Sequence, residues 1–239
     1  LRFIGAVSSL LDGYTIITGD HSIRNNRPIM PLIQGVVGLG GKCFSSKNDG
    51  FAPIIVKGPI TPGTVMIDGQ DSQPVSGLII ACMFLDGQTE ILVTKPGELP
   101  WIDVTLSWLV RLGVKYENYN YSRYLISGKA DYNGFAYNVP GDFSSIAFPL
   151  AAALISKQRL VIKGLDVNDS QGDKKIIEIL SKMGAKIKVN SETLVLAPTN
   201  FISGITQDIN ICIDALPILA VLACFANSPS KFYNAKIAR

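Results

Sequence analysis

Hydrophobic and polar positions along the chain follow a pattern that returns about every 70 residues. Its clearest copy lies near the middle of the second half. Apolar residues recur at helical spacing over residues 173–183, and lysine and glutamate take the other side. Gly184 ends this predicted helix, because glycine accommodates the left-handed backbone common just past a helix C-terminus. Two strands are predicted next, at 186–189 and 193–196, with a turn at 190–192.

The same order of elements is predicted three times. A short helix of small and apolar residues, such as 77–84 or 146–155, comes first, and a β-rich run such as 159–162 follows. The amphipathic helix and the two strands complete the copy. Gly40, Gly113 and Gly184 align at the ends of the three amphipathic helices. The repeat is therefore helix-strand-helix-strand-strand, and the predicted fold class is α/β, built from such α+β repeats.

Counting the copies predicts a chain cut at both ends. The first copy begins inside its short helix at Leu1, without an initiator Met, and the last stops after the strand that follows helix 215–226. Two copies are complete and two are cut. We therefore expect an internal piece of a longer protein.

Composition narrows the classes of partner. A chain of 239 residues with 47% hydrophobic content can form one large domain or two moderate ones. The net charge is only +3, and no Lys/Arg stripe is interleaved with aromatics, so no nucleic-acid partner is expected. The longest apolar stretch, 216–226, contains Pro217 and falls short of the ~20 residues of a membrane span. No membrane partner is expected either.

Cysteine and histidine offer little for catalysis. The four cysteines are singletons without metal-ligand or redox-motif spacing, which fits a reducing, cytoplasmic setting. Cys82 and Cys224 lie in apolar helix patterns and are interpreted as core thiols. His21 is the only histidine and is interpreted as a polar loop residue. A Ser-His-Asp triad or a multi-histidine zinc site would therefore have almost nothing to use.

A glycine-rich run at 35–42 imitates a phosphate-binding loop. The Walker pattern fails there, because Val36 replaces its first glycine and Cys43 replaces the magnesium-binding Ser or Thr. The alignment of Gly40 with the other helix-ending glycines favours a structural role.

Polar residues gather before two of the predicted helices. Residues 68–73 precede a helix predicted at 74–85, and residues 141–145 precede one at 146–155. Hydroxyl, carboxylate and amide groups beside free backbone N–H donors can receive an anion. Serine and aspartate are equally the usual N-capping residues. Both interpretations stay open, with capping favoured on the chemistry alone.

In this repeat, a series of short motifs resembles one known family over the entire chain, that of 5-enolpyruvylshikimate-3-phosphate synthase. Each motif is weak alone, and their order makes them specific. The motifs are Asn25-Asn26-Arg27-Pro28-Ile29, Asp71-Ser72-Gln73, Pro100-Trp101-Ile102-Asp103-Val104-Thr105-Leu106, Gly141-Asp142-Phe143-Ser144-Ser145 with Leu150-Ala151-Ala152-Ala153, Gln171-Gly172-Asp173, and Asp214-Ala215.

The resemblance implies a fold and a reaction. Members have the enolpyruvyl transferase fold, with two domains of three repeats each and substrates bound between them. Residues 1–139 then form most of the first domain and residues 140–239 part of the second. The family transfers the enolpyruvyl group of phosphoenolpyruvate to the 5-hydroxyl of shikimate 3-phosphate. No metal or organic cofactor is implied, and a monomer is expected.

Matching the motifs gives candidate site residues. Arg27 matches an arginine that binds phosphoenolpyruvate, and its planar fork suits phosphate or carboxylate oxygens. Ser72 and Gln73 match the turn that holds shikimate 3-phosphate, and Trp101 is either a wall against the ring or a core residue. Asp214 matches the carboxylate that accepts the proton of the attacking hydroxyl; its alternative is the N-cap of helix 215–226. Arg2 also matches a family arginine, and no direct contact is assigned to it.

The chain also departs from the family. Asp71 stands where many members have serine and would repel a phosphate if it pointed inward, and Glu98 replaces a phosphate-binding hydroxyl. Whether these two residues alter phosphate binding stays open. The family's amino-terminal Lys-Ser and arginine, its glycine-rich turn and its Lys-Glu-Ser/Thr-Asp-Arg motif are missing. The isolated chain is therefore expected to be inactive.

Two alternatives remain open. The sister enzyme that transfers enolpyruvyl to a nucleotide-activated N-acetylglucosamine shares the repeat, but it carries a reactive cysteine, for which Cys43 is the nearest candidate. A non-catalytic binding module built from the same repeats is the other alternative.

Overall fold

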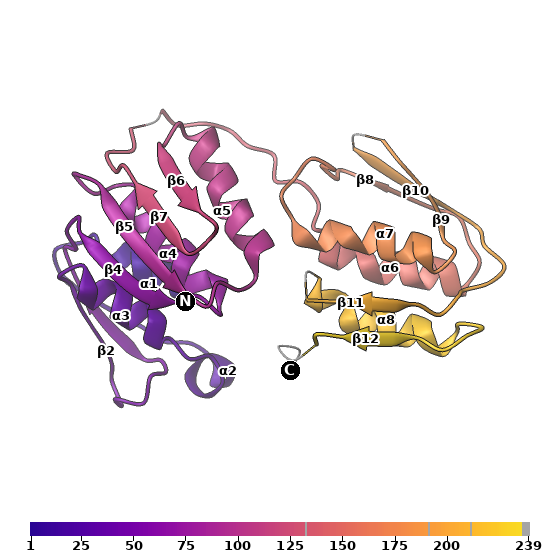
Figure 1. Ribbon diagram of the computed structural model, residues 1–239, viewed down its shortest axis with the longest axis horizontal. Helices are drawn as coiled ribbons and strands as arrows, with labels where there is room; N and C mark the ends of the chain where they lie inside the picture. Colours follow the sequence, from indigo (N-terminus) through magenta and orange to yellow (C-terminus); the bar gives the residue numbers. More distant parts are fainter. Residues whose placement is uncertain (132, 191, 211, 236–239) are drawn as a thin grey trace. The chain divides into compact units, whose positions relative to one another are not determined.

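The computed structural model describes residues 1–131, 133–190, 192–210 and 212–235. It divides into two compact units, Leu1–Gly134 and Phe135–Arg239, and each is considered by itself (Figure 1). This division falls close to the predicted boundary after residue 139. That residues 1–139 and 140–239 belong to two separate domains of the family stays a prediction.

The first unit contains two repeats in sequence. Its elements are α1 (Arg2–Ser8), β1 (Tyr14–Ile17), α2 (His21–Asn25), α3 (Met30–Gly38), β2 (Lys42–Ser45), β3 (Ile54–Lys57), β4 (Thr64–Asp68), α4 (Ser72–Cys82), β5 (Thr89–Thr94), α5 (Leu99–Arg111), β6 (Tyr116–Tyr119) and β7 (Arg123–Ile126).

The second unit contains a third repeat and part of a further one. Its elements are α6 (Phe143–Ile155), β8 (Leu160–Lys163), the 3-10 helix η1 (Gly172–Lys174), α7 (Lys175–Lys182), β9 (Lys186–Val189), β10 (Thr193–Ala197), β11 (Thr206–Asp208), the 3-10 helix η2 (Ile213–Ala215), α8 (Leu216–Cys224) and β12 (Lys231–Tyr233).

The predicted repeat is confirmed by strand order. Each copy places its last strand in the middle of three antiparallel strands, giving the orders β1-β3-β2, β5-β7-β6 and β8-β10-β9. Since strand order depends on how the connections run, the three copies follow the same path and not merely the same sequence of elements.

The three aligned glycines end equivalent helices, as predicted. Gly40, Gly113 and Gly184 have φ of +87°, +69° and +99° and follow α3, α5 and α7. In each case the glycine N–H and the next N–H return to carbonyls of the last helical turn, as in Gly113 to Val110 and Val114 to Leu109. This is the Schellman arrangement, in which the residue at the glycine position must take a left-handed backbone.

The five-element repeat predicted from the sequence lacks a strand that the structure places before the first helix of two of the copies. β4 pairs in parallel with β5 across α4, and β11 pairs in parallel with β12 across η2 and α8. β11 is only Thr-Gln-Asp and carries no hydrophobic alternation, so local pattern could not identify it. A parallel pair requires a crossover connection, and the helix between the two strands supplies it.

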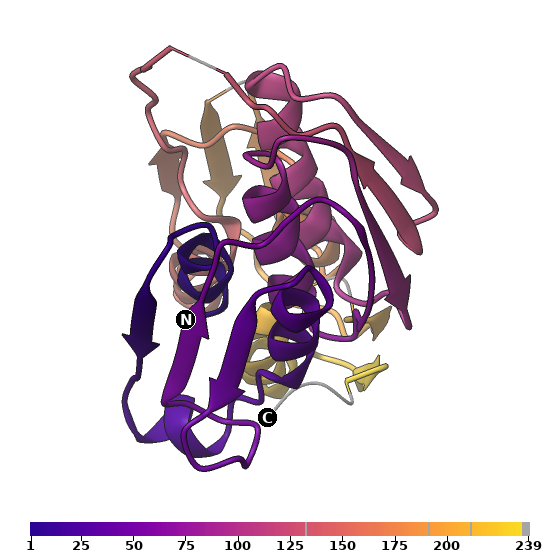
Figure 2. The same ribbon diagram turned by 90° about the vertical axis from the view of Figure 1, so that its left-hand side faces the viewer.

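The core of the first unit forms around α4, most of whose residues are buried. This helix contacts α1, α3 and α5. Figure 2 shows the helices of the unit standing between the strands of its two sheets. Leu78 and Ile79 are fully buried, and each contributes roughly 1.5–3 kcal/mol through removal from water. The second unit has its own buried cluster, centred on α6 and α7.

The glycine-rich run at 35–42 has the structural role that the sequence favoured. Gly35 lies in α3, where an added Cβ would come within 2.3 Å of a Leu78 methyl group. Glycine therefore lets α3 approach α4 closely, and no phosphate loop forms.

Two interpretations of single residues were wrong. His21 is not a loop residue but the first residue of α2, which Asp20 caps by accepting from the Ile23 N–H at 2.9 Å. Cys82 is buried as predicted, whereas Cys224, the last residue of α8, is exposed. α8 is apolar on nearly every side, so its sequence cannot show which face packs inward.

Within the described residues, no helix is long and apolar enough to cross a bilayer.

Candidate active site

The predicted shikimate 3-phosphate turn forms the N-terminus of α4. The helix begins at Ser72, two residues earlier than predicted, because Pro74 is tolerated in a first turn. Asp71 caps it by accepting from the Gln73 N–H at 3.0 Å. Ser72 is buried and the Gln73 side chain is exposed. Capping is thus confirmed here, while the binding roles of Ser72 and Gln73 stay predictions.

A second carboxylate reaches the same helix end from outside it. Glu98, the residue before α5, accepts from the Ser72 N–H at 3.1 Å and from the Ser72 hydroxyl at 2.8 Å. The helix N-terminus therefore carries two acidic side chains, from positions that are 27 residues apart.

Arg2 connects this helix end to the loop that carries Arg27. One guanidinium nitrogen of Arg2 lies 2.8 Å from the Asp71 carboxylate and donates to the Pro28 carbonyl at 3.1 Å. Arg2 is only 6% exposed, and its Nε is buried without a hydrogen-bond partner. Arg2 is therefore a buried side chain that links Asp71 to Pro28, two residues in stretches that the sequence predicted as substrate-binding.

Arg27 lies in the loop between α2 and α3 with its side chain exposed. No hydrogen bond or ion pair to Arg27 occurs in the described part of the chain. Its guanidinium is therefore free to meet an anion from solvent, as the predicted role requires. Trp101, in the first turn of α5, is partly exposed and belongs to neither buried cluster, which leaves its ring available as a wall.

In the second unit, the N-terminus of α6 is capped as the sequence favoured. The helix begins at Phe143, and Asp142 accepts from the N–H groups and the hydroxyls of Ser144 and Ser145. Burial is the largest single influence and raises the pKa of the Asp142 carboxyl. The four hydrogen-bond donors outweigh it together, so the pKa of Asp142 lies below its ordinary value. The Gln171 side-chain oxygen also contacts this helix start, because it accepts from the Phe143 N–H at 3.0 Å.

Asp214 is exposed in η2, and its capping alternative is wrong. The N-cap position of α8 is Ala215, and no side-chain capping bond occurs there. Over the described residues, no hydrogen bond or ion pair engages the Asp214 carboxylate. The fold therefore makes no described use of this side chain, and its catalytic role stays a prediction.

Asp173 is the unexpected member of this region. α6, η1 and η2 contact one another, which brings Asp173 close to Asp142 and Asp214. Asp173 is 1% exposed, and neither carboxyl oxygen has a partner among the described residues. Burial, followed by the charges of Asp214 and Asp142, raises the pKa of Asp173 to about 7.

The raised pKa of Asp173 predicts a pH-dependent stability. Between pH 3.8, the ordinary value, and about 7, the folded protein holds a proton that the unfolded chain has released. The free energy of unfolding should therefore fall as pH rises through this window, by at most about 1.4 kcal/mol per pH unit. In Asp173→Asn the fall should be smaller, as measured by urea unfolding between pH 4 and 8.

Glu192→Gln is the matched control, because it removes an exposed carboxylate from the same unit. It should keep the parental pH dependence. Equal slopes in the parent and in Asp173→Asn would show that Asp173 is ionised throughout the range.

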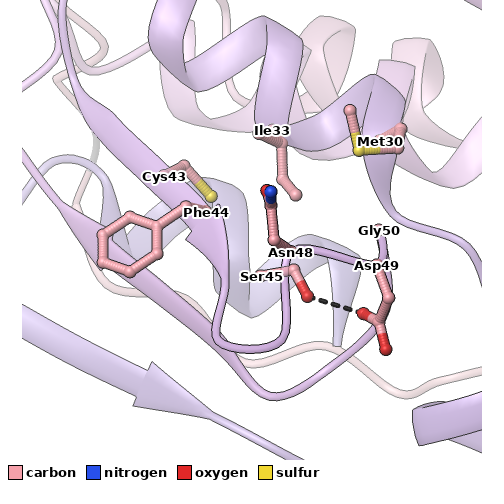
Figure 3. A pocket seen from close by; sticks show the side chains of 8 residues that line it. All are labelled: Met30, Ile33, Cys43, Phe44, Ser45, Asn48, Asp49 and Gly50. Carbon is pink, nitrogen blue, oxygen red and sulfur yellow. Dashed lines mark hydrogen bonds between the residues drawn. The ribbon is translucent and has the colours of Figure 1, made fainter.

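A pocket of the first unit lies beside β2 and includes none of the predicted site residues. Its lining comes from α3, β2 and the following turn, where the Ser45 hydroxyl donates to Asp49 at 2.7 Å (Figure 3). Cys43 contributes to this lining, and burial raises the pKa of its thiol to about 12. A buried thiol that stays protonated is a poor nucleophile, which argues against Cys43 as the reactive cysteine of the sister enzyme.

Three residues important to this geometry were not assigned a contact by the sequence. Arg2, Glu98 and Asp173 were noticed only as matches or departures, because their partners are far away in sequence. The available signals were the match of Arg2 to a family arginine, the place of Asp173 in a family motif and the carboxylate of Glu98 where the resembling family has a hydroxyl, and none of them indicated a contact. Among the described residues, no group of three or more His, Cys, Asp or Glu side chains could hold a metal ion.

Comparison with known proteins identifies the family. The sequence model described as EPSP synthase (3-phosphoshikimate 1-carboxyvinyltransferase) matches residues 1–239. The chain is 40% identical over 239 residues to the 3-phosphoshikimate 1-carboxyvinyltransferase of Acetivibrio thermocellus, covering all of this chain and 56% of that protein. The enzyme of the same name from Methanococcus maripaludis is 37% identical over 246 residues, with 57% covered.

A solved structure supports the fold. An EPSP synthase structure from Acinetobacter baumannii matches with a TM-score of 0.78 at 20% identity, over all of this chain and 56% of that one. The chain thus has the α/β fold of that enzyme and spans about half the length of the curated relatives it matches. With the family's repeat, glycine-ended helices and motif order all present, the chain belongs to the EPSP synthase (3-phosphoshikimate 1-carboxyvinyltransferase) family.

Proposed function

We propose that the natural protein containing this chain transfers the enolpyruvyl group of phosphoenolpyruvate to the 5-hydroxyl of shikimate 3-phosphate. The products are 5-enolpyruvylshikimate 3-phosphate and phosphate, on the way to chorismate and the aromatic amino acids. The observation that carries the proposal is the family match over the whole chain together with free, exposed Asp214 and Arg27 side chains.

In this proposal each residue has one task. Arg27 binds phosphoenolpyruvate through charge-assisted hydrogen bonds, and Ser72 and Gln73 bind shikimate 3-phosphate beside Trp101. Asp214 accepts the proton of the 5-hydroxyl as its oxygen attacks the central carbon of phosphoenolpyruvate. An acid protonates the methylene carbon, and loss of phosphate with that methyl proton restores the double bond.

The proposal includes the setting of the enzyme. Four unpaired cysteines fit a reducing compartment, so we place the protein in the cytoplasm. It acts as a monomer on two small anionic substrates. Sedimentation of the natural protein at assay concentration measures the assembly state directly.

The activity is tested with the natural protein, shikimate 3-phosphate and phosphoenolpyruvate. We expect release of one phosphate for each enolpyruvyl product, followed by phosphate assay and mass spectrometry. UDP-N-acetylglucosamine serves as the control acceptor and should give no product. Turnover of that acceptor instead, or binding of both shikimate-pathway substrates without any turnover, would overturn the proposal.

A further inference from the structure

The N-terminus of α4 already holds an anion that belongs to the chain itself. Glu98 accepts both the Ser72 N–H and the Ser72 hydroxyl through one carboxylate oxygen. These two donors are among those that a phosphate oxygen at this helix end would use. The Glu98 carboxylate therefore engages donors that such a phosphate oxygen would need.

The local cap satisfies only one of the free N–H donors at this helix start and leaves the Ser72 N–H to the second carboxylate. Asp71, the local N-cap, already accepts from the Gln73 N–H, and such a local cap is the ordinary way to satisfy a helix start. Glu98 comes from the loop before α5, with a left-handed backbone at φ +48° that is uncommon for a residue other than glycine.

The loop that carries Glu98 is held in place by its neighbours. The Gly97 N–H donates to the Gly69 carbonyl at 3.0 Å, and a Cβ at Gly97 would come within 2.6 Å of the Gln70 carbonyl oxygen. Close backbone contact thus fixes the point from which the Glu98 side chain extends, while its own side-chain torsions remain able to turn it away.

The local charges distinguish the two carboxylates. Arg2 forms an ion pair with Asp71, and its Nε remains buried without a partner at the same place. In the part of the chain that the structure describes, no ion pair neutralises Glu98. Arg2, Asp71 and Glu98 together leave one uncompensated negative charge at the helix start, which repels an incoming phosphate.

The geometry points to Glu98 as an intramolecular competitor that a phosphate-bearing ligand must displace from Ser72 before it binds at the N-terminus of α4. The inference rests on the proposed function for the identity of that ligand, shikimate 3-phosphate. It makes Glu98 a residue that sets the affinity of this helix end, because every anion that uses the two Ser72 donors must first displace its carboxylate.

The test measures the affinity of the natural protein for inorganic phosphate and for shikimate 3-phosphate by titration calorimetry. Glu98→Gln keeps the shape and removes the charge, and Glu98→Ser also removes the side chain that reaches Ser72. We expect both variants to bind each probe about tenfold or more tightly than the parent, with the larger gain in Glu98→Ser. Asp12→Asn, which removes an exposed carboxylate from the same unit, should change neither affinity.

The outcomes separate this inference from the proposed function. Tighter phosphate binding in both Glu98 variants, with no binding of shikimate 3-phosphate by any protein, would support the role of Glu98 and overturn the proposed substrate. Unchanged or weaker binding of both probes in both variants, with melting temperatures close to the parent's, would overturn the role of Glu98. Because Glu98→Gln and Glu98→Ser are measured separately, the test still gives a result if one of them does not fold.

Discussion

Asp214→Asn in the natural protein should melt close to the parent temperature and turn over at least about a hundredfold more slowly. A proton acceptor is typically worth ~10²–10⁴ in rate, and asparagine cannot take the proton of the 5-hydroxyl. Stability should hardly change, since the Asp214 side chain is exposed and caps neither η2 nor α8. Steady-state kinetics and thermal unfolding of the same preparations measure the two effects separately.

The matched control for this prediction is Glu192→Gln, which makes the same carboxylate-to-amide exchange at an exposed position of the second unit. It should leave turnover unchanged. Near-parental turnover in Asp214→Asn would remove Asp214 from the mechanism.

Arg27→Ala should weaken the saturation of the enzyme by phosphoenolpyruvate about ten- to a hundredfold. The reason is the loss of a charge-assisted hydrogen bond, worth roughly 1.5–3 kcal/mol. The fold should be unaffected, because the exposed Arg27 side chain makes no described contact that its loss would break. The measurement is the phosphoenolpyruvate concentration dependence of the rate at saturating shikimate 3-phosphate.

Two further variants sharpen the result for Arg27. Arg27→Lys keeps the charge without the bidentate fork, so it should restore only part of the affinity. Arg24→Ala removes the same charge three residues earlier, from the exposed surface of α2, and should have little effect. If both alanine variants weaken phosphoenolpyruvate equally, the effect is general electrostatics and not a contact by Arg27.

Local pattern was sufficient for most helices and strands because each requires only neighbouring residues. The amphipathic period of residues 173–183 predicted one helix where the structure has η1 followed by α7, and Gly184 marked where the helix ends. Local pattern failed where a strand is short and polar, as in β11, and where a helix is apolar all round, as in α8 with its exposed Cys224. In both cases the partner across space, not the segment itself, decides the structure.

The sequence by itself determined the repeat, the glycine-ended helices and the family, and it nominated Arg27, Ser72, Gln73, Trp101 and Asp214. All of these depend on order and spacing along the chain, which the sequence displays directly. Only the tertiary structure decided that Arg2 joins Pro28 to Asp71, that Glu98 reaches Ser72, and that Asp173 is buried without a partner. These contacts join residues far apart in the chain, and their energies depend on burial and distance, which exist only once the chain has folded.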